Sequence, residues 1–202
     1  FKTYLYQKRF NYNLINNGLK NLIVMGTCYE YGKRTGKISE NTFTKPLIPY
    51  AVSKLKLLNS IMNLKKKKKF KFTWLRPFFV FGKNKKRKTL FTIINGGHKD
   101  ELSKLKLPGK LIRDFVPVNF LSRVIIKIIK LNNGFEILNV TSGKGVSIKN
   151  FIKKNLKNKK NIKLINMNGK NPNKFEPNSF WGDNSKLKKI ISKWKKKGRF
   201  LE

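Results

Sequence analysis

Residues 21–32 read NLIVMGTCYEYG, a short apolar run that stops at Gly26 and gives way to polar and aromatic residues. A continuous apolar run of this length suits a strand that is buried on both faces of a parallel sheet. Glycine at the end of such a run is typical of a turn. Thr27 is then the first side chain beyond the carboxyl end of the predicted strand, which is the edge where open α/β sheets bind ligands.

A helix and a second strand are predicted downstream. Pro49 suits the first turn of a helix, and from Tyr50 to Met62 apolar residues recur at steps of three and four, which is helical spacing. Residues 70–75 alternate between apolar and polar, so a strand is expected to end near Arg76. Strand, helix and strand in this order predict a right-handed crossover between parallel strands.

Tyr50 and Lys54 are four residues apart on the predicted helix, so their side chains share one face. A neighbouring cation favours a phenolate over a phenol. An unperturbed tyrosine, with a pKa of ~10, is too weakly acidic to act as a general base at neutral pH. The same spacing is common by chance, but Thr27 and Pro77 fall at the same predicted edge. The pair is therefore a candidate for proton transfer.

The remaining elements follow from the same patterns. Helices are expected at residues 1–17, 89–95, 120–131, 148–156 and 185–200, strands at 113–118, 137–140 and 162–165, and loops at 32–49 and 172–183. Gly18 is expected to close the first helix, and Ser147 to cap the helix that follows it.

Composition bounds the class of protein. The 202 residues, 39% of them hydrophobic, suffice for one domain with a small appendage. No apolar run approaches the roughly 18 residues of a membrane span, and the first residues do not form a signal peptide. The single cysteine, Cys28, cannot form an internal disulfide. A cytoplasmic protein without a membrane partner is the default expectation.

The net charge of +39 is a feature of nucleic-acid-binding proteins. Against that function, only seven of the 48 basic residues are arginine, the side chain favoured for paired phosphate and base contacts. Asparagine is also abundant, at 24 residues, and the lysines are spread along the chain. We expect no specific nucleic-acid partner, and a basic nucleic-acid-binding module remains the alternative.

Five motifs occur in one order along the chain. They are GTCYEYG at 26–32, PYAVSK at 49–54, LRPFFVFG at 75–82, RDFVPV at 113–118 and NVTSGKGVSI at 139–148. This series resembles the extended short-chain dehydrogenase/reductases, in particular the NAD-dependent epimerase/dehydratase family that modifies sugar nucleotides.

The resemblance implies an α/β fold: a partial Rossmann-like, doubly wound parallel sheet with a small α/β substrate-binding part. Residues 1–82 and 113–140 would form the C-terminal part of the NAD(P)-binding domain. Residues 83–112 and 141–202 would form the substrate-binding part.

The resemblance also implies roles for individual residues. Thr27 would hydrogen-bond the reacting sugar oxygen, and Tyr50 would exchange a proton with it as general acid/base. Lys54 would lower the pKa of Tyr50 and hold the nicotinamide ribose. Pro77 would lie at the nicotinamide end of NAD or NADP. Arg113 would bind the diphosphate of a nucleotide-sugar substrate, since its fork makes paired, charge-assisted bonds.

Departures from the family pattern narrow the expected activity. The cofactor's glycine-rich turn belongs before residue 1, so the chain is expected to be an N-terminally truncated piece. Cys28 and Tyr29 replace the acidic pair of the dehydratases, and Phe79 replaces an asparagine of many epimerases. The expectation is a 4-reductase or 4-epimerase of a nucleotide-linked (deoxy)hexose, working as a homodimer. An inactive fragment is the alternative.

Some single residues allow two interpretations. Cys28 is either a catalytic acid or a small core residue. Arg113 could instead form a surface ion pair with Asp114, and Asp183 either caps the last helix or lines the substrate pocket. His98, the single histidine, is expected to be solvated and not to bind a metal.

Overall fold

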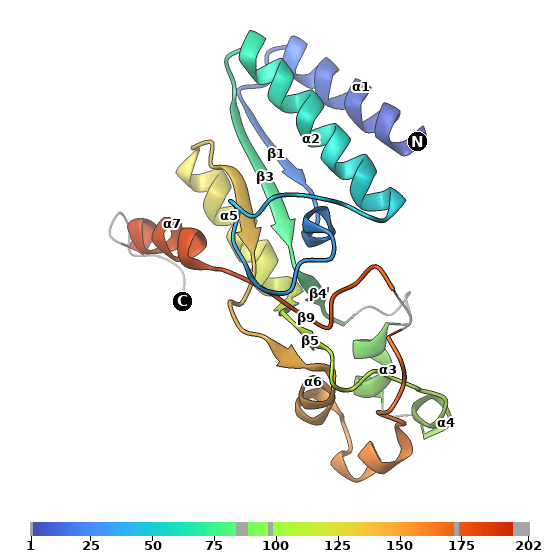
Figure 1. Cartoon of the computed structure of the whole chain (residues 1–202). Coiled ribbons are helices and arrows are strands. Elements are labelled where there is room, and N and C mark those ends of the chain that lie inside the picture. Colours follow the sequence, from blue (N-terminus) through green and yellow to red (C-terminus); the bar gives the residue numbers. More distant parts are fainter. Residues whose placement is uncertain (1, 84–88, 97–98, 172–173, 196–202) are drawn as a thin grey trace.

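The computed structural model describes residues 2–83, 89–96, 99–171 and 174–195. Its centre is a three-stranded parallel sheet of order β1 (Asn21–Met25), β3 (Lys71–Pro77) and β7 (Glu136–Val140) (Figure 1). Leu22 pairs with Phe72, and Leu75 pairs with Leu138. The predicted parallel crossover from β1 to β3 is confirmed, and β1 and β7 form the two edges of this sheet.

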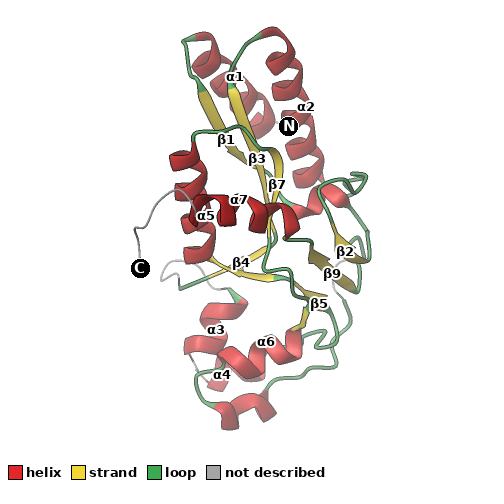
Figure 2. Ribbon diagram, turned by 90° about the vertical axis from the view of Figure 1, so that its left-hand side faces the viewer, coloured by secondary structure: helices red, strands yellow, loops and turns green. Residues whose placement is uncertain are grey.

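Helices cover both faces of the sheet, as Figure 2 shows. On one face lie α1 (Lys2–Asn16) and α2 (Pro49–Lys67), and on the other lie α5 (Val118–Leu131) and α7 (Ser185–Lys195). The first pair of helices packs on the strand residues Leu22, Phe72 and Trp74 and buries Ile15, Leu57, Leu58 and Ile61. The second pair packs on Leu75 and Leu138 and buries Val124, Ile128, Leu187 and Ile190. The doubly wound α/β architecture is therefore confirmed.

A smaller helical part lies beyond the carboxyl edge of the sheet (Figure 1). It contains α3 (Leu90–Gly96), α4 (Lys99–Ser103) and α6 (Ile148–Asn155), which share a third core around Ile94, Leu102, Phe151 and Ile152. Ser147 caps α6 as predicted, because its hydroxyl accepts from the Asn150 N–H at 3.2 Å. The division into cofactor and substrate parts stays a proposal.

Short strands join the two parts. A mixed sheet has the order β2 (Gly36–Ile38), β9 (Ser179–Gly182), β5 (Ile112–Arg113) and β8 (Val146–Ser147), and β4 (Phe79–Phe81) pairs with β6 (Phe115–Pro117).

Among the described residues, no helix is both long enough and apolar enough to cross a membrane.

Three predictions of local structure were wrong. The predicted loops at 32–49 and 172–183 contain β2 and β9, which pair with each other across more than 140 residues of sequence. The predicted strand at 162–165 belongs to a 3₁₀ helix, η2 (Lys159–Leu164), whose first turn is capped by the side chain of Asn158. Both features depend on contacts that an apolar pattern does not encode.

The predicted strand at 113–118 is divided at Asp114, whose carboxylate turns into the protein. That carboxylate accepts the backbone N–H groups of Ser142 (2.8 Å), Gly143 (3.1 Å) and Gly182 (3.2 Å), and also the Thr141 hydroxyl. Asp114 thus joins the ends of β7 and β9. The interpretation of Asp114 as a surface partner of Arg113 was wrong.

A second buried carboxylate, that of Glu30, anchors the turn that follows β1. Glu30 belongs to the 3₁₀ helix η1 (Cys28–Tyr31) and is fully buried. It accepts from Arg76 Nε at 2.7 Å, from Trp74 Nε1 at 3.0 Å and from the Thr27 N–H at 2.9 Å. A Cβ on Gly26 would lie 2.1 Å from Trp74 Nε1 and 2.4 Å from the Glu30 carboxylate, so only glycine fits there.

We expect Glu30→Gln to lower the free energy of unfolding by about 3 kcal/mol, because it leaves the buried Arg76 guanidinium without its counter-charge. Urea denaturation measures the change. Glu136→Gln is the matched control, since Glu136 forms an exposed pair with Lys65, and such pairs contribute at most about 1 kcal/mol. Equal losses for the two variants would contradict the role given to Glu30.

Candidate active site

The first predicted site residue, Thr27, lies directly after β1 at the carboxyl edge of the sheet. Thr27 is buried and caps η1: its Oγ1 accepts from the Tyr29 N–H at 3.3 Å, while Glu30 returns a bond to the Thr27 N–H. A hydroxyl that accepts one bond can still donate its own proton. The capping box therefore fixes the Thr27 side chain in a position from which it can donate to a ligand.

Tyr50 and Lys54 lie in the first turns of α2, which packs against η1. The Tyr50 side chain is partly open to solvent, with 54% of the residue exposed. Lys54 Nζ lies 5.9 Å from the centroid of the Tyr50 ring and donates to Gln7 Oε1 at 3.4 Å. Pro77 ends β3 at the same edge, beside Val140 of β7. The structure thus gathers these predicted residues at one edge.

The pKa of Tyr50 is raised, chiefly by partial burial and further by the nearby Glu30 and Cys28. Burial lowers the pKa of Lys54, and Glu30 acts in the opposite direction. Lys54, which the family resemblance gives as the group that lowers the Tyr50 pKa, is not among the groups that shift it in this structure, and that role stays a prediction. The physical reason is that the Lys54 ammonium lies over the ring and bonds to Gln7, so it does not act mainly on the phenolic oxygen.

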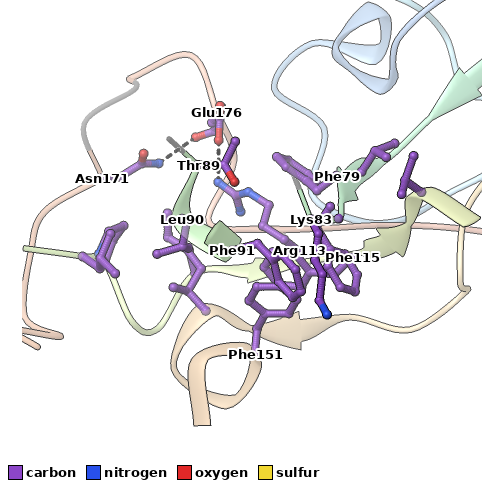
Figure 3. Close-up of a pocket in the computed structure, with 18 residues that line it drawn as sticks. Phe79, Lys83, Thr89, Leu90, Phe91, Arg113, Phe115, Phe151, Asn171 and Glu176 are labelled. Atoms are coloured by element: carbon purple, nitrogen blue, oxygen red, sulfur yellow. Dashed lines mark hydrogen bonds and ion pairs between the residues drawn. The ribbon is translucent and has the colours of Figure 1, made fainter. Parts of the chain in front are cut away.

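Arg113 lies elsewhere, at a pocket of about 540 Å³ between the sheet and the helical part (Figure 3). The pocket walls are mainly aromatic, with Phe79, Phe81, Phe91, Phe115 and Phe151 among the lining side chains. The rings of Phe115 and Phe151 stack with centroids 3.8 Å apart. Arg113 is held by the Ile112 carbonyl at 2.8 Å, and its guanidinium carbon lies 5.3 Å from the Phe79 ring. Thr27, Tyr50 and Lys54 do not line this pocket.

Glu176 connects the two parts of the site. Its Oε1 accepts from the Tyr29 hydroxyl at 2.6 Å, and its Oε2 accepts from Arg113 Nη2 at 2.8 Å. The Tyr29 ring in turn packs edge-on against Phe79, with centroids 5.9 Å apart. A path of direct contacts therefore runs from the turn that carries Thr27 to the guanidinium of Arg113.

Sequence reasoning missed the carboxylates that build the site: Glu30, Asp114 and Glu176. The chain has only nine acidic residues, and both Glu30 and Asp114 stand inside the motifs quoted above. An acid inside a motif of so basic a chain is a usable signal. Glu176 has no such signal, because its partners Tyr29 and Arg113 are 147 and 63 residues away.

The sequence left two interpretations each for Cys28 and Asp183, and the structure shows what surrounds these side chains. Cys28 is buried in the core, and its pKa is raised by burial and then by Glu176, Glu30 and Asp114, which fits a core residue rather than an acid catalyst. Asp183 accepts from the Ser185 N–H at 2.8 Å at the start of α7. His98 lies outside the described residues, within which no cluster of potential metal ligands occurs.

Comparison with known proteins assigns the chain to a family. Residues 11–141 match the sequence model of the NAD dependent epimerase/dehydratase family. The chain belongs to this family. Among curated family members, it is 30% identical over 135 residues to dTDP-6-deoxy-L-talose 4-dehydrogenase (NAD(+)) of Aggregatibacter actinomycetemcomitans. The match covers 65% of this chain and 49% of that enzyme, so this chain spans about half the length of its curated relative.

Solved structures of other proteins share the fold. UDP-glucuronic acid 4-epimerase from Bacillus cereus, in complex with UDP-glucuronic acid and NAD, superposes with a TM-score of 0.73 at 21% identity. That match covers 98% of this chain and 62% of the epimerase. UDP-glucose 4-epimerase from Thermotoga maritima, with UDP-glucose, gives a TM-score of 0.72 at 20% identity, over 88% of this chain and 59% of that protein. The Rossmann-like fold predicted from the motifs is confirmed.

The surroundings of Tyr50 predict its titration. We expect its phenol to ionise above the ordinary pKa of about 10, because partial burial and Glu30 both disfavour the phenolate. An alkaline titration followed by tyrosinate absorbance, taken as the difference between wild type and Tyr50→Phe, isolates this group. A midpoint below that of a model tyrosine would contradict the arrangement described.

Proposed function

We propose that the chain carries the proton-transfer and diphosphate-binding groups of an NAD(P)-dependent sugar-nucleotide enzyme that acts at C4 of a nucleotide-linked hexose or deoxyhexose. The observation that carries the proposal is the contact path from the Thr27 turn through Tyr29 and Glu176 to Arg113. Such a path suits a ligand that has its reacting carbon at one end and its nucleotide at the other.

Tyr50 and Thr27 would share the oxygen on C4. For reduction of a 4-ketone, the Tyr50 phenol donates its proton to this oxygen as C4 gains a hydride, and the Thr27 hydroxyl holds the same oxygen. The Tyr50 phenol, like that of an ordinary tyrosine with a pKa of ~10, is protonated at neutral pH, which is the form that this direction requires. A 4-epimerase would use the same two groups and would run the proton transfer in both directions.

The residues at the sheet edge fit the nicotinamide end of NAD or NADP. When bound there, the cofactor would supply or accept the hydride. Lys54 offers a partly buried ammonium one helical turn from Tyr50, a donor suited to the ribose hydroxyls. Pro77, at the end of β3, would lie beside the nicotinamide ring. The curated relative named above is an NAD(+) enzyme, which favours NAD for this chain as well.

The aromatic pocket would hold the nucleotide. Arg113 is one of the side chains that line this pocket, and its planar fork of N–H donors matches a diphosphate. Phe79, Phe81, Phe91 and Phe115 line the pocket with aromatic surface of the kind on which a base can stack. A nucleotide sugar bound in this way would extend from the pocket toward Thr27.

A homodimer is proposed as the assembly. Leu5, Tyr6 and Phe10 of α1 are exposed, although they are large apolar side chains. They lie on one of the two helices at the Tyr50 side of the sheet (Figure 1). Pairing through α1 and α2 of two copies would cover them.

Removal of the Tyr50 hydroxyl tests the proposed chemistry. In protein expressed from the complete gene, Tyr50→Phe should reduce kcat at least about a hundredfold, the usual contribution of a general acid or base, with the fold unchanged. A panel of UDP- and dTDP-linked 4-keto sugars and hexoses, followed by the absorbance of NAD(P)H and by product stereochemistry, measures it. Tyr12→Phe, which removes a hydroxyl that donates to the Ser60 carbonyl of α2, serves as the control. Full activity of Tyr50→Phe would reject the assigned role.

Replacement of Arg113 tests the nucleotide site separately. Arg113→Lys should weaken UDP binding to the 202-residue chain about tenfold or more, because an ammonium cannot reproduce a paired contact with a diphosphate. Titration calorimetry measures the affinity. Arg123→Lys is the control: it makes the same substitution at an exposed position of α5 outside the pocket, and this variant should bind UDP like wild type. Equal affinities for all three proteins would remove Arg113 from the site.

A further inference from the structure

Gln7 is the single glutamine of this chain, which has 24 asparagines. It lies in α1, which runs beside α2 (Figure 1). Its Oε1 accepts a hydrogen bond from Lys54 Nζ of α2 at 3.4 Å. Because an ammonium has donors and no acceptor, only the oxygen of the amide can bind it. Gln7 is therefore in direct contact with the lysine to which the proposed function assigns the ribose of the cofactor.

The backbone of α1 around Gln7 is held in place against α2. Near the start of α1, the Tyr4 hydroxyl lies 3.0 Å from Ser60 Oγ of α2. Near its end, Ile15 is buried in the core that the two helices share with the sheet. Between these contacts, Asn11 Nδ2 donates to the Gln7 carbonyl at 2.7 Å. The Gln7 side chain therefore extends toward Lys54 from a fixed position.

Charged and titratable groups face Lys54 from the neighbouring elements. Burial lowers the pKa of Lys54, and Glu30 of η1 acts in the opposite direction. Glu30 is itself paired with Arg76 of β3 at 2.7 Å. The Tyr50 ring centroid lies 5.9 Å from the Lys54 ammonium, and on α1 the Lys8 ammonium lies over a ring of its own helix. The amide that accepts from Lys54 is neutral.

A neutral acceptor suits a lysine that must keep its charge for a ligand. A partly buried ammonium is destabilised relative to the free amine unless its N–H groups are hydrogen-bonded. The Gln7 amide supplies such a bond and adds no negative charge. A carboxylate at the same place would also hold the ammonium, but it would cancel the charge. An ammonium has three donors, so the bond to Gln7 leaves donors for ribose hydroxyls.

We propose that Gln7 is a positioning residue: its side-chain oxygen holds the Lys54 ammonium in place in the first turns of α2 and leaves the charge available to the cofactor. This inference rests on the proposed function, in which Lys54 binds the ribose hydroxyls of NAD or NADP. The role assigned to Gln7 runs through Lys54 alone.

The reactivity of Lys54 in the 202-residue chain tests the contact without any cofactor. Acetylation rates over roughly pH 7 to 11, followed by peptide mass spectrometry with isotope-labelled reagent, give the pKa of a single lysine, because only the free amine reacts. Gln7→Met keeps the length of the side chain and removes the acceptor, so the pKa of Lys54 should fall and its acetylation at about pH 8 should be about threefold faster. Gln7→Glu keeps the shape and adds a negative charge, so acetylation should be about threefold slower or more.

Shifts of opposite sign in two variants of similar size distinguish positioning from packing. A variant that only exposes Lys54 raises the rate without moving the midpoint of the pH profile. Asn13→Asp is the control: it makes the same change from amide to carboxylate at an exposed position of α1, and Lys54 should react as in wild type. Gln7→Glu alone decides the sign if Gln7→Met folds poorly. Equal midpoints in wild type and both Gln7 variants would overturn the proposal.

A second measurement uses protein expressed from the complete gene. If charged Lys54 binds the cofactor, kcat/KM for NAD or NADP is lost as pH rises through the pKa of Lys54. This alkaline limb should therefore lie about half a pH unit lower in Gln7→Met, and it should lie higher in Gln7→Glu. A profile that is reduced in height with its limb unmoved rejects the role of Gln7 and leaves the proposed function standing. If wild type turns over no sugar nucleotide with either dinucleotide, the proposed function is rejected and the role of Gln7 falls with it.

Discussion

The buried ion pair between Glu30 and Arg76 is the constraint on which the site depends. It joins the turn after β1 to the middle strand of the parallel sheet, with Nε and Oε2 2.7 Å apart. Trp74 and the Thr27 N–H complete the coordination of the same carboxylate. A charge removed from water in this way is stable only when it is paired and hydrogen-bonded. The orientation of η1, and with it the positions of Thr27 and Tyr29, follows from this one carboxylate.

Two other carboxylates also accept hydrogen bonds from segments that are far apart in the sequence. Asp114 collects the N–H groups at the ends of β7 and β9, and Glu176 joins η1 to β5. Each carboxylate satisfies donors that would otherwise be lost where regular structure ends. Three of the nine acidic residues thus hold the site together, while the lysines, which are far more numerous, occupy mainly outer positions. The lysines therefore account for the net charge of the surface, whereas the carboxylates account for the contacts within the site.

Local patterns predicted the parts of the fold that are set by local physics. The β1–α2–β3 unit, the cap at Ser147 and the short helix near Leu90 follow from apolar period and capping chemistry. The pairing of β2 with β9 and the contacts of Glu176 could not be predicted, because they join residues more than 60 positions apart. For Tyr50 and Lys54, spacing predicted a shared helix face. The direction of the Tyr50 pKa shift required knowledge of burial and of Glu30.

The edge position of β1 has a consequence for how copies of the chain behave together. Within the described residues, β1 hydrogen-bonds to β3 on one side, and its other side carries backbone donors and acceptors that a further strand can bind, whether from outside the 202 residues or from another copy. At low ionic strength, the mutual repulsion of molecules that each carry +39 opposes strand addition between copies. Added salt screens that repulsion at separations beyond about 10 Å at an ionic strength of about 0.1 M. The colloidal stability of the 202-residue chain should therefore decline as ionic strength rises.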